Sequence, residues 1–418
     1  MSEPGSGRLR RTVARLTGQT RDERLDALER AIRKLSESQR DQAGALQRGL
    51  DSVADAAARQ ATAKMSQEIL EAVRALGGQI DRQIEDQLAH GGAAEQQRLA
   101  ERRLFKRFDE IAASRKPIVV GPWTGEVGFE LLYWVPFLAW ARERWALAPD
   151  RHVIISRGGV RTWYGMPEAR YADLFSTITP DQFRAGTNQD EHKQRRASAF
   201  DREMVEAALG TPAIADVEQI HPELMYRMFM PFWREEAGLA TVDRFTRYRR
   251  LEPLSDPVLD ALPSEYVAAR FYFSDCFPDT AENRGFARLV VSTLAERTPV
   301  VLLNPGIRVD DHSDLAPPAG NRVFSISAGL APERNLAVQS SVISRARAFV
   351  GTYGGYSYLA PFYDVPALAF YSVRSFKTHH LHLAQRVFER LGSATVIPLD
   401  VAHASLVQSA LGAMTAAS

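Results

Sequence analysis

The 418-residue sequence has a single cysteine, Cys276, and no long apolar run. One cysteine excludes a disulfide framework and a cysteine-built zinc site, and it is typical of a protein kept in a reducing compartment. No stretch approaches the roughly 18 consecutive apolar residues that a membrane-spanning helix requires. The first arginines, Arg8, Arg10 and Arg11, are followed by no apolar core of a signal peptide. We therefore expect a cytoplasmic location and leave peripheral attachment to a membrane open.

Neither sign of charge predominates in the sequence. Lys and Arg number 52 against 51 Asp and Glu, a net charge of +1, so nothing in the balance of charge indicates a nucleic-acid partner. The short signatures of a P-loop, a dinucleotide-binding turn and an H-E-x-x-H zinc site are missing as well, and we expect no bound cofactor. The length suits two or three domains, and a hydrophobic content of 45% allows large cores.

Aromatic residues are scarce in residues 1–115, which contain no Trp and no Tyr. Apolar residues there recur at heptad spacing in two runs, Leu25, Leu28, Ile32, Leu35 and Ile69, Val73, Leu76, Ile80. Such a narrow apolar stripe cannot bury itself, so we expect a long helical coiled coil that makes the protein a homo-oligomer. A solvated helix or a partly disordered tail is the alternative, because Gln39 and Gln42 interrupt the pattern.

From residue 116 onward, apolar runs of strand length alternate with amphipathic segments of helix length. The expected strands are 118–120, 152–156, 266–273, 299–303, 322–326, 348–350, 367–371 and 395–399. The expected helices include 131–145, 201–209, 222–236, 280–297, 335–347, 356–363, 378–391 and 401–414. This alternation predicts an α/β protein with parallel sheets, in two Rossmann-like domains over 116–262 and 263–418.

The most informative stretch is 350–371, VGTYGGYSYLAPFYDVPALAFY. It predicts a strand end, a glycine turn, a short helix and a second strand. Glycines between a strand and a helix start let the backbone approach a ligand, and the free N–H groups of the helix favour a phosphate. An ordinary tight turn is the alternative interpretation.

Ligands of open α/β sheets bind beyond the carboxyl ends of the strands, so the loops there supply the candidate residues. Glycines, hydroxyls and arginines recur in these loops, as a phosphate-bearing ligand requires. The candidates for binding such a phosphate are Asn304, Gly306, Arg308, Thr352, Tyr353, Gly354, Gly355, Ser357, Tyr358 and Arg374. The candidates for the acceptor side of a cleft are Gly125, Arg157, Gly158, Gly159, Arg270 and Asp275.

Two βα regions ending in GTYGGYSYLAPFYDVPALAFYS resemble the GT-B class of glycosyltransferases, over about 117–415. In that class a glycine turn and short helix of the C-terminal domain grip the phosphates of the donor. The loop at Gly125-Glu126 resembles the acceptor-side Gly-Glu loop of the bacterial Kdo transferases. The resemblance implies transfer of a sugar from a nucleotide sugar to a glycan or other acceptor. It also implies inversion, because the expected helix 356–363 lacks the glutamate of retaining members.

An inverting transfer needs a base for the acceptor hydroxyl. Glu126, between Gly125 and Gly128, is the first candidate and Glu130 the second; the alternative role for Glu126 is to cap the following helix. The cluster Asp310, Asp311, His312 and Asp314 could hold a cation, but a solvated acidic loop is the favoured interpretation and no metal is expected.

Two other functions fit the same layout. A nucleotide-sugar epimerase or hydrolase would need no separate acceptor. A non-catalytic scaffold would combine the coiled coil with a degenerate transferase domain.

Overall fold

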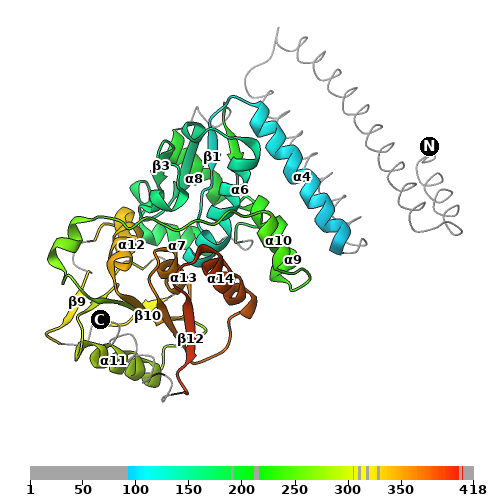
Figure 1. Cartoon of the computed structure of the whole chain (residues 1–418). Helices are drawn as coiled ribbons and strands as arrows, with labels where there is room; N and C mark the ends of the chain where they lie inside the picture. Colours follow the sequence, from blue (N-terminus) through cyan, green and yellow to red (C-terminus); the bar gives the residue numbers. More distant parts are fainter. Residues whose placement is uncertain are drawn as a thin grey trace, which may run out of the picture. The chain divides into compact units, whose positions relative to one another are not determined.

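The computed structural model describes residues 93–189, 193–210, 216–304, 306–308, 312–316, 320–326, 330–403 and 407 (Figure 1). By its internal contacts the chain divides into two units, Met1–His90 and Gly91–Ser418. Both predicted heptad runs lie outside the described residues, as does most of the predicted helix 401–414. The coiled coil and the oligomer therefore stay predictions.

Helix α4 (Ala93–Ala113) begins the described part of the chain. The sequence places these residues in the separate helical region 1–115, but α4 packs into the folded unit that follows. Its residues Leu104, Phe108 and Ile111 are at most 2% exposed, and Phe108 stacks on Trp145 with ring centroids 4.7 Å apart. The apolar stripe that looked like the end of a coiled coil is buried against the neighbouring helices instead.

Four parallel strands form the N-terminal sheet, in the order β3-β2-β1-β4. They are β1 (Ile118–Val120), β2 (His152–Ser156), β3 (Arg170–Asp173) and β4 (Glu218–Ile220). The sequence predicted the two central strands and missed β3 and β4, which are short edge strands with charged and polar residues. The helices in this part are α5 (Val127–Phe129), α6 (Val135–Trp145), α7 (Pro180–Gln189), α8 (Ala199–Leu209), α9 (Glu223–Trp233) and α10 (Leu239–Arg244).

Both faces of the N-terminal sheet are covered. Ile118 and Val120 of β1 belong to a large core cluster that also includes residues of the second sheet. Val119, between them, belongs to a smaller cluster with Phe175 and Phe183. Because successive side chains of a strand point to opposite faces, this division explains why β1 is apolar at every position.

Six parallel strands form the C-terminal sheet, in the order β12-β11-β10-β5-β7-β9. They are β5 (Val267–Arg270), β7 (Val300–Leu302), β9 (Val323–Ser325), β10 (Ala348–Thr352), β11 (Ala367–Tyr371) and β12 (Val396–Asp400). The associated helices are α11 (Ala281–Ala295), α12 (Asn335–Arg345), α13 (Gly355–Phe362) and α14 (Thr378–Leu391). The parallel α/β class predicted from the sequence is confirmed.

The strand predicted over 266–273 is divided in the structure. It leaves the C-terminal sheet after Arg270 and continues as β6 (Tyr272–Phe273), which pairs antiparallel with β8 (Ser313–Asp314). Thr352 Oγ1 holds this turn, because it accepts from the Tyr272 amide at 3.1 Å and donates to the Tyr272 carbonyl at 2.7 Å. The division places Arg270 and Tyr272 at the carboxyl end of the sheet.

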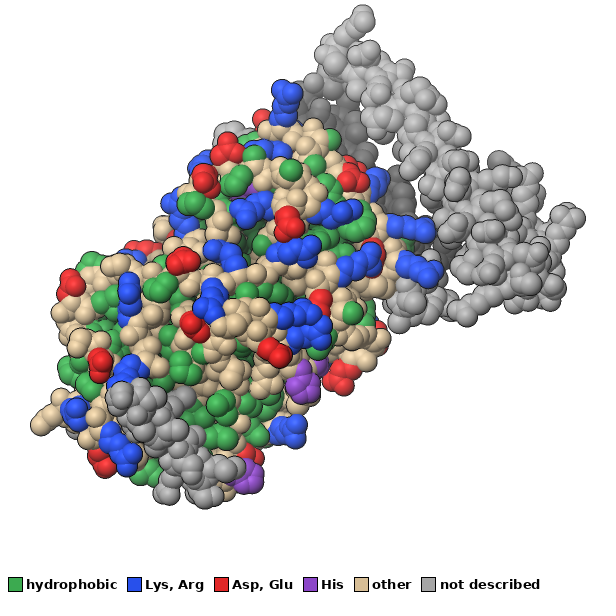
Figure 2. Space-filling model, viewed as in Figure 1, with side chains coloured by type: hydrophobic (Ala, Val, Ile, Leu, Met, Phe, Trp, Pro, Cys, Tyr) green, Lys and Arg blue, Asp and Glu red, His purple; other side chains and the backbone are tan. Residues whose placement is uncertain are grey.

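On the face shown in Figure 2, basic side chains lie among acidic ones. Ion pairs within the described residues include Arg250 with Asp364 at 3.1 Å and Arg390 with Asp243 at 2.6 Å. No helix within the described ranges is both long and apolar enough to cross a bilayer.

Candidate functional site

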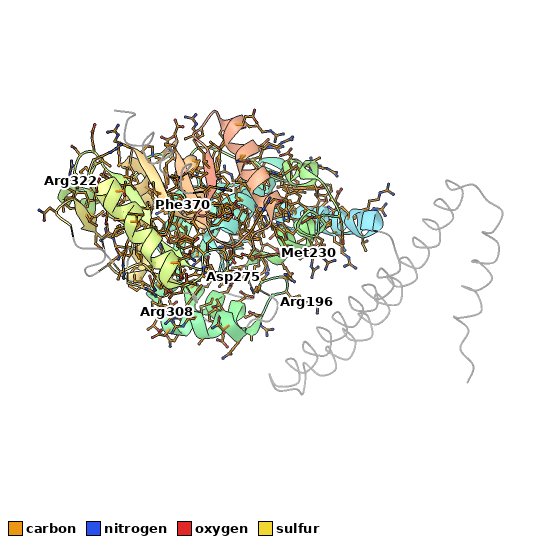
Figure 3. The ribbon with its side chains drawn as sticks, turned by 90° about the horizontal axis from the view of Figure 1, so that it is seen from below. Arg196, Met230, Asp275, Arg308, Arg322 and Phe370 are labelled. Carbon is orange, nitrogen blue, oxygen red and sulfur yellow. The ribbon has the colours of Figure 1, made fainter. Side chains whose placement is uncertain are left out.

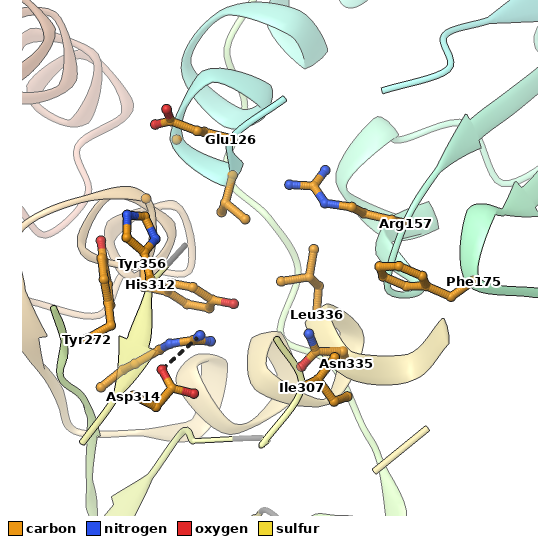
Figure 4. Close-up of a pocket in the computed structure, with 14 residues that line it drawn as sticks. Glu126, Arg157, Phe175, Tyr272, Ile307, His312, Asp314, Asn335, Leu336 and Tyr356 are labelled. Atoms are coloured by element: carbon orange, nitrogen blue, oxygen red, sulfur yellow. Dashed lines mark hydrogen bonds and ion pairs between the residues drawn. The ribbon is translucent and has the colours of Figure 1, made fainter. Parts of the chain in front are cut away.

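A cleft that is partly open to solvent lies between the two sheets (Figure 4). The N-terminal part supplies Glu126, Val127, Gly128, Arg157 and Phe175. The C-terminal part supplies Arg270, Tyr272, Ile307, His312, Asp314, Asn335, Leu336, Gly355 and Tyr356. The walls follow the carboxyl ends of β1, β2, β5 and β10, where ligands of such sheets bind.

Glu126 stands at the start of α5, on the N-terminal wall. It is the N-cap residue by backbone conformation, with φ −71° and ψ 151°, yet its side chain makes no capping hydrogen bond. The carboxylate is exposed, and Figure 4 shows it on the rim of the cleft. Helix capping therefore does not occupy this carboxylate, which leaves it available to a ligand.

Arg157 directly follows β2 and points into the space between the walls (Figure 4). It is 6% exposed. One guanidinium nitrogen donates to the Gly125 carbonyl, and the other lies 3.6 Å from Glu130 Oε2. Arg157 thus joins the loop before Glu126 to the buried carboxylate behind it, with its positive charge toward the cleft.

Glu130, the second candidate base, does not line the cleft. It is fully buried and accepts from Ser156 Oγ at 2.7 Å and from the Tyr164 hydroxyl at 2.6 Å. Burial raises the pKa of this carboxyl, and the charge of Arg157 partly opposes that rise. Glu126 has an extended backbone as the N-cap residue of α5, whereas Glu130 lies within the helix, at the start of a π-helical turn, η1 (Glu130–Trp134). The two carboxylates therefore differ in surroundings, one exposed and the other fully buried. The position of Glu130 argues for a structural role as the counter-ion of Arg157.

Arg270, which the sequence grouped with the acceptor side, belongs to the opposite wall at the end of β5. Its guanidinium contacts Asp314 at 3.3 Å and Gln339, and it lies 4.1 Å from the ring centroid of Tyr356. These contacts hold a positive charge in a fixed orientation beside the start of α13, and such a group suits a phosphate. Figure 4 shows the ion pair with Asp314 as a dashed line.

The predicted acidic cluster is only partly described. Asp310 and Asp311 lie outside the described residues, Asp314 is engaged by Arg270, and the His312 ring lies 5.0 Å from that of Tyr272. Within the described ranges, no group of three or more metal-ligating side chains occurs.

The glycines of the central segment contact the protein itself. A Cβ added to Gly351 would lie 2.0 Å from the Arg270 carbonyl oxygen, one on Gly354 1.9 Å from the Tyr272 hydroxyl, and one on Gly355 2.8 Å from the Gly128 amide nitrogen. Gly354 also has a φ of +155°. These contacts alone account for the glycines, so binding of phosphate by this turn stays a proposal.

The other candidates in this segment serve its packing. Ser357 Oγ caps α13 through the amide and carbonyl of Gly354, at 3.2 Å and 2.7 Å. The hydroxyls of Tyr353 and Tyr358 contact each other in the interior. With Thr352, which holds the β5–β6 turn, these buried residues support the wall of the cleft without lining it.

Gly158 and Gly159 have φ values of +71° and +82°, which favour glycine. They pack on the start of α12, where the Ala337 amide donates to the Gly158 carbonyl at 2.8 Å. The loop after β2 therefore joins the two halves of the unit and carries Arg157 with it.

The remaining candidates lie away from the cleft lining. Asn304 bonds to Leu315 and Ser325, and Gly306 lies in an open turn with φ +69°. Asp275 and Arg308, both labelled in Figure 3, are exposed, as is Arg374. Only the neighbour of Arg308, Ile307, reaches the cleft.

Several lining residues were not predicted. They are Gly128 in α5, Phe175 in the short helical turn after β3, Tyr272 in β6, Asn335 at the start of α12 and Tyr356 at the start of α13. Gly128 and Tyr356 adjoin segments that the sequence did single out. The others follow from which segments the tertiary structure brings together.

The chain matches no protein-family model and no curated protein. It is similar in outline to a glycosyl transferase family 9 protein from Veillonella parvula, with 11% identity, 72% of this chain and 98% of that chain covered, and a TM-score of 0.42. E. coli ADP-heptose LPS heptosyltransferase II has 14% identity to the chain, with 71% of this chain and 98% of that chain covered and a TM-score of 0.37. The iron-containing dodecameric glycosyltransferase TibC from enterotoxigenic E. coli has 14% identity and a TM-score of 0.36, with 61% of this chain covered. The chain spans 58% of the length of that protein. Likeness at these scores establishes neither the family nor the activity.

Proposed function

We propose that the protein is an inverting glycosyltransferase of GT-B type that transfers a sugar from a nucleotide sugar to an acceptor hydroxyl. The observation that carries the proposal is that Glu126, Arg157 and Arg270 line one cleft at the carboxyl ends of two parallel sheets. A transfer with inversion needs a base on one side of the anomeric carbon and positive charge on the other. Glu126 and the two arginines are groups of these kinds.

In the proposed step, Glu126 takes the proton of the acceptor hydroxyl while the acceptor oxygen forms a bond to the anomeric carbon. The bond from that carbon to the donor phosphate breaks, and the nucleotide leaves with the electron pair. Arg270 and Arg157, with the N–H groups at the start of α13, stabilise the negative charge on the departing phosphate. Arg270 is well suited to this, because Asp314 and Tyr356 already hold its guanidinium in place.

We further propose that the heptad runs over 25–35 and 69–80 associate with those of a second copy, so that the enzyme acts as a homo-oligomer. The narrow apolar stripe in the sequence motivates this.

The first experiment is a thermal-shift screen of the full chain against nucleotide sugars. A ligand that binds only the folded state raises the unfolding temperature. A donor found in this way is then incubated with and without candidate acceptors while release of the nucleotide is measured. Turnover that needs no acceptor would replace transfer by hydrolysis or epimerisation, and binding to none of the donors would contradict the proposal.

The second experiment tests the base. Glu126→Gln keeps the size of the side chain but cannot take a proton, so we expect turnover to fall roughly 10²–10⁴-fold with donor binding retained. Asp275→Asn is the matched control, because Asp275 is exposed and does not line the cleft. A Glu126→Gln variant with full turnover would remove Glu126 from the proposed mechanism.

A further inference from the structure

The loop between β1 and α5, residues 121–125, ends at Glu126 and is held along most of its backbone. The Gly121 amide donates to Ile220 O at 3.0 Å, and the Trp123 amide donates to Ile155 O at 2.9 Å. These two bonds come from the neighbouring strands of the sheet. Side chains from elsewhere in the chain hold the rest of the loop: Gln219 donates to the Gly121 carbonyl, Arg157 to the Gly125 carbonyl, and Gln194 contacts two residues between them.

Gln194 lies in a polar segment of the sequence, yet it is 1% exposed. Its Oε1 accepts from the Thr124 amide at 3.0 Å, and its Nε2 donates to the Pro122 carbonyl at 2.7 Å. The backbone at Gln194 has a φ of +61°, an uncommon value for a residue other than glycine. An unfavourable backbone conformation thus accompanies the inward direction of this side chain.

Asp201 fixes the orientation of the Gln194 carboxamide. Asp201 Oδ1 accepts from Gln194 Nε2 at 3.0 Å, so two acceptors face that nitrogen and the oxygen must face Thr124. The other carboxylate oxygen, Oδ2, accepts from the Ser198 amide and hydroxyl, both at 2.8 Å, and lies 3.3 Å from His221 Nε2. Asp201 is 1% exposed and is itself immobilised by the start of α8.

We propose that Gln194 is a positioning residue for Glu126. Its carboxamide, oriented by Asp201, fixes the loop two residues before Glu126 and so sets the place of the carboxylate in the cleft. The role in catalysis rests on the proposed transferase function, whereas the role in holding the loop does not. Groups that act on a reacting centre need supports of this kind, because small displacements cost large factors in rate.

Gln194→Met tests the loop without any substrate. Methionine keeps the length of the side chain but removes both hydrogen-bonding groups, so the Thr124 amide loses its partner. Amide hydrogen exchange at single-residue resolution should be at least about 10-fold faster at Thr124, since one such bond contributes roughly that factor. The Trp123 amide, held by Ile155, is the internal control and should keep its protection.

Ser198→Ala is the matched control variant. It removes both hydrogen bonds of the Ser198 hydroxyl, one to the Asp201 carboxylate and one from the Asp201 amide, and so weakens the start of α8. The bond from the Ser198 amide to Asp201 and the contacts of Gln194 stay in place. Ser198→Ala should lower the unfolding temperature without changing exchange at Thr124. Should Gln194→Met fail to fold, Gln194→Glu keeps the acceptor for Thr124 but offers no donor to Pro122 or Asp201, and it should also speed exchange there.

With a donor identified as described above, Gln194→Met should lower the turnover number roughly 10–100-fold and leave the donor KM within about 3-fold. Ser198→Ala should change neither. Unchanged exchange at Thr124 in a folded variant overturns the inference whether or not the protein is a transferase. Faster exchange with full turnover overturns the link to Glu126. A wild-type protein without transferase activity contradicts the proposed function alone, and exchange at Thr124 then decides whether Gln194 holds the loop.

Discussion

Substitution of Gly355 by alanine tests the close contact between α5 and α13. The added Cβ would lie 2.8 Å from the Gly128 amide nitrogen and 3.0 Å from Val127 Cβ. Real Cβ contacts essentially never fall below 3.0 Å, and backbone cannot move aside as a flexible side chain does. One of the two helices must therefore shift.

The change in the free energy of unfolding that Gly355→Ala should cause follows from two opposing effects. Inserting one methyl group into a well-packed contact costs roughly 1–3 kcal/mol. Alanine is favoured over glycine within a helix by at most about 1 kcal/mol, and by less at the first helical position. We therefore expect Gly355→Ala to lower the free energy of unfolding by about 1–2 kcal/mol, with no ligand present.

Two other glycines are matched controls. A Cβ on Gly128 would meet its nearest atoms at 3.3 Å and 3.4 Å, so the helical gain should nearly offset the crowding and the change should stay within about 0.5 kcal/mol. A Cβ on Gly285, in α11, meets nothing within 4 Å, so Gly285→Ala should stabilise the protein by about 0.5–1 kcal/mol.

The assay is thermal or urea unfolding of the four proteins followed by circular dichroism. If Gly355→Ala is as stable as Gly285→Ala, the two helices do not meet as the structure shows them, and the glycine must be explained by a ligand instead. If Gly355→Ala is destabilised as expected, a loss of donor binding in that variant would not by itself show that Gly355 touches phosphate.

Three further predictions concern stability. Burial raises the pKa of Glu130, so the contribution of this residue to stability is largest below the ordinary pKa of a glutamate and is lost as pH rises. In urea unfolding, the free energy of unfolding of Glu130→Gln should therefore rise relative to that of the wild type from pH 4.5 to pH 7.5. A difference between the two proteins that does not change with pH would contradict this. Burial lowers the pKa of His380 to about 3, so this side chain should lower stability as pH falls from about 6.5 toward 3, and His380→Gln should flatten that part of the curve. Deletion of residues 1–90 should leave a folded protein, which light scattering should show as a smaller particle if the coiled coil assembles the protein. Deletion of residues 1–115 should lower the free energy of unfolding by several kcal/mol, because Phe108 and Ile111 are lost from the core. Equal stability of the two truncated proteins would contradict the packing of α4.

The sequence alone determined the class of fold and the positions of most central elements. The prediction for 367–371 matches β11, and that for 378–391 matches α14. Buried strands and amphipathic helices can be predicted from the local periodicity of apolar residues, which needs no knowledge of the rest of the chain. The same local logic placed Glu126 and Arg157 at strand ends, where both line the cleft.

Only the tertiary structure decided which of these residues act together. Gly355 faces Gly128, and Gln194 holds Thr124, across long separations in the sequence that no local pattern encodes. Glu130 is buried while Glu126 is exposed, because Glu126 is the extended N-cap residue of α5 and Glu130 lies within the helix, so the two carboxylates do not share one helical face. Local periodicity reports whether a side chain is buried, and the direction and partner of that side chain depend on contacts that exist only once the chain has folded.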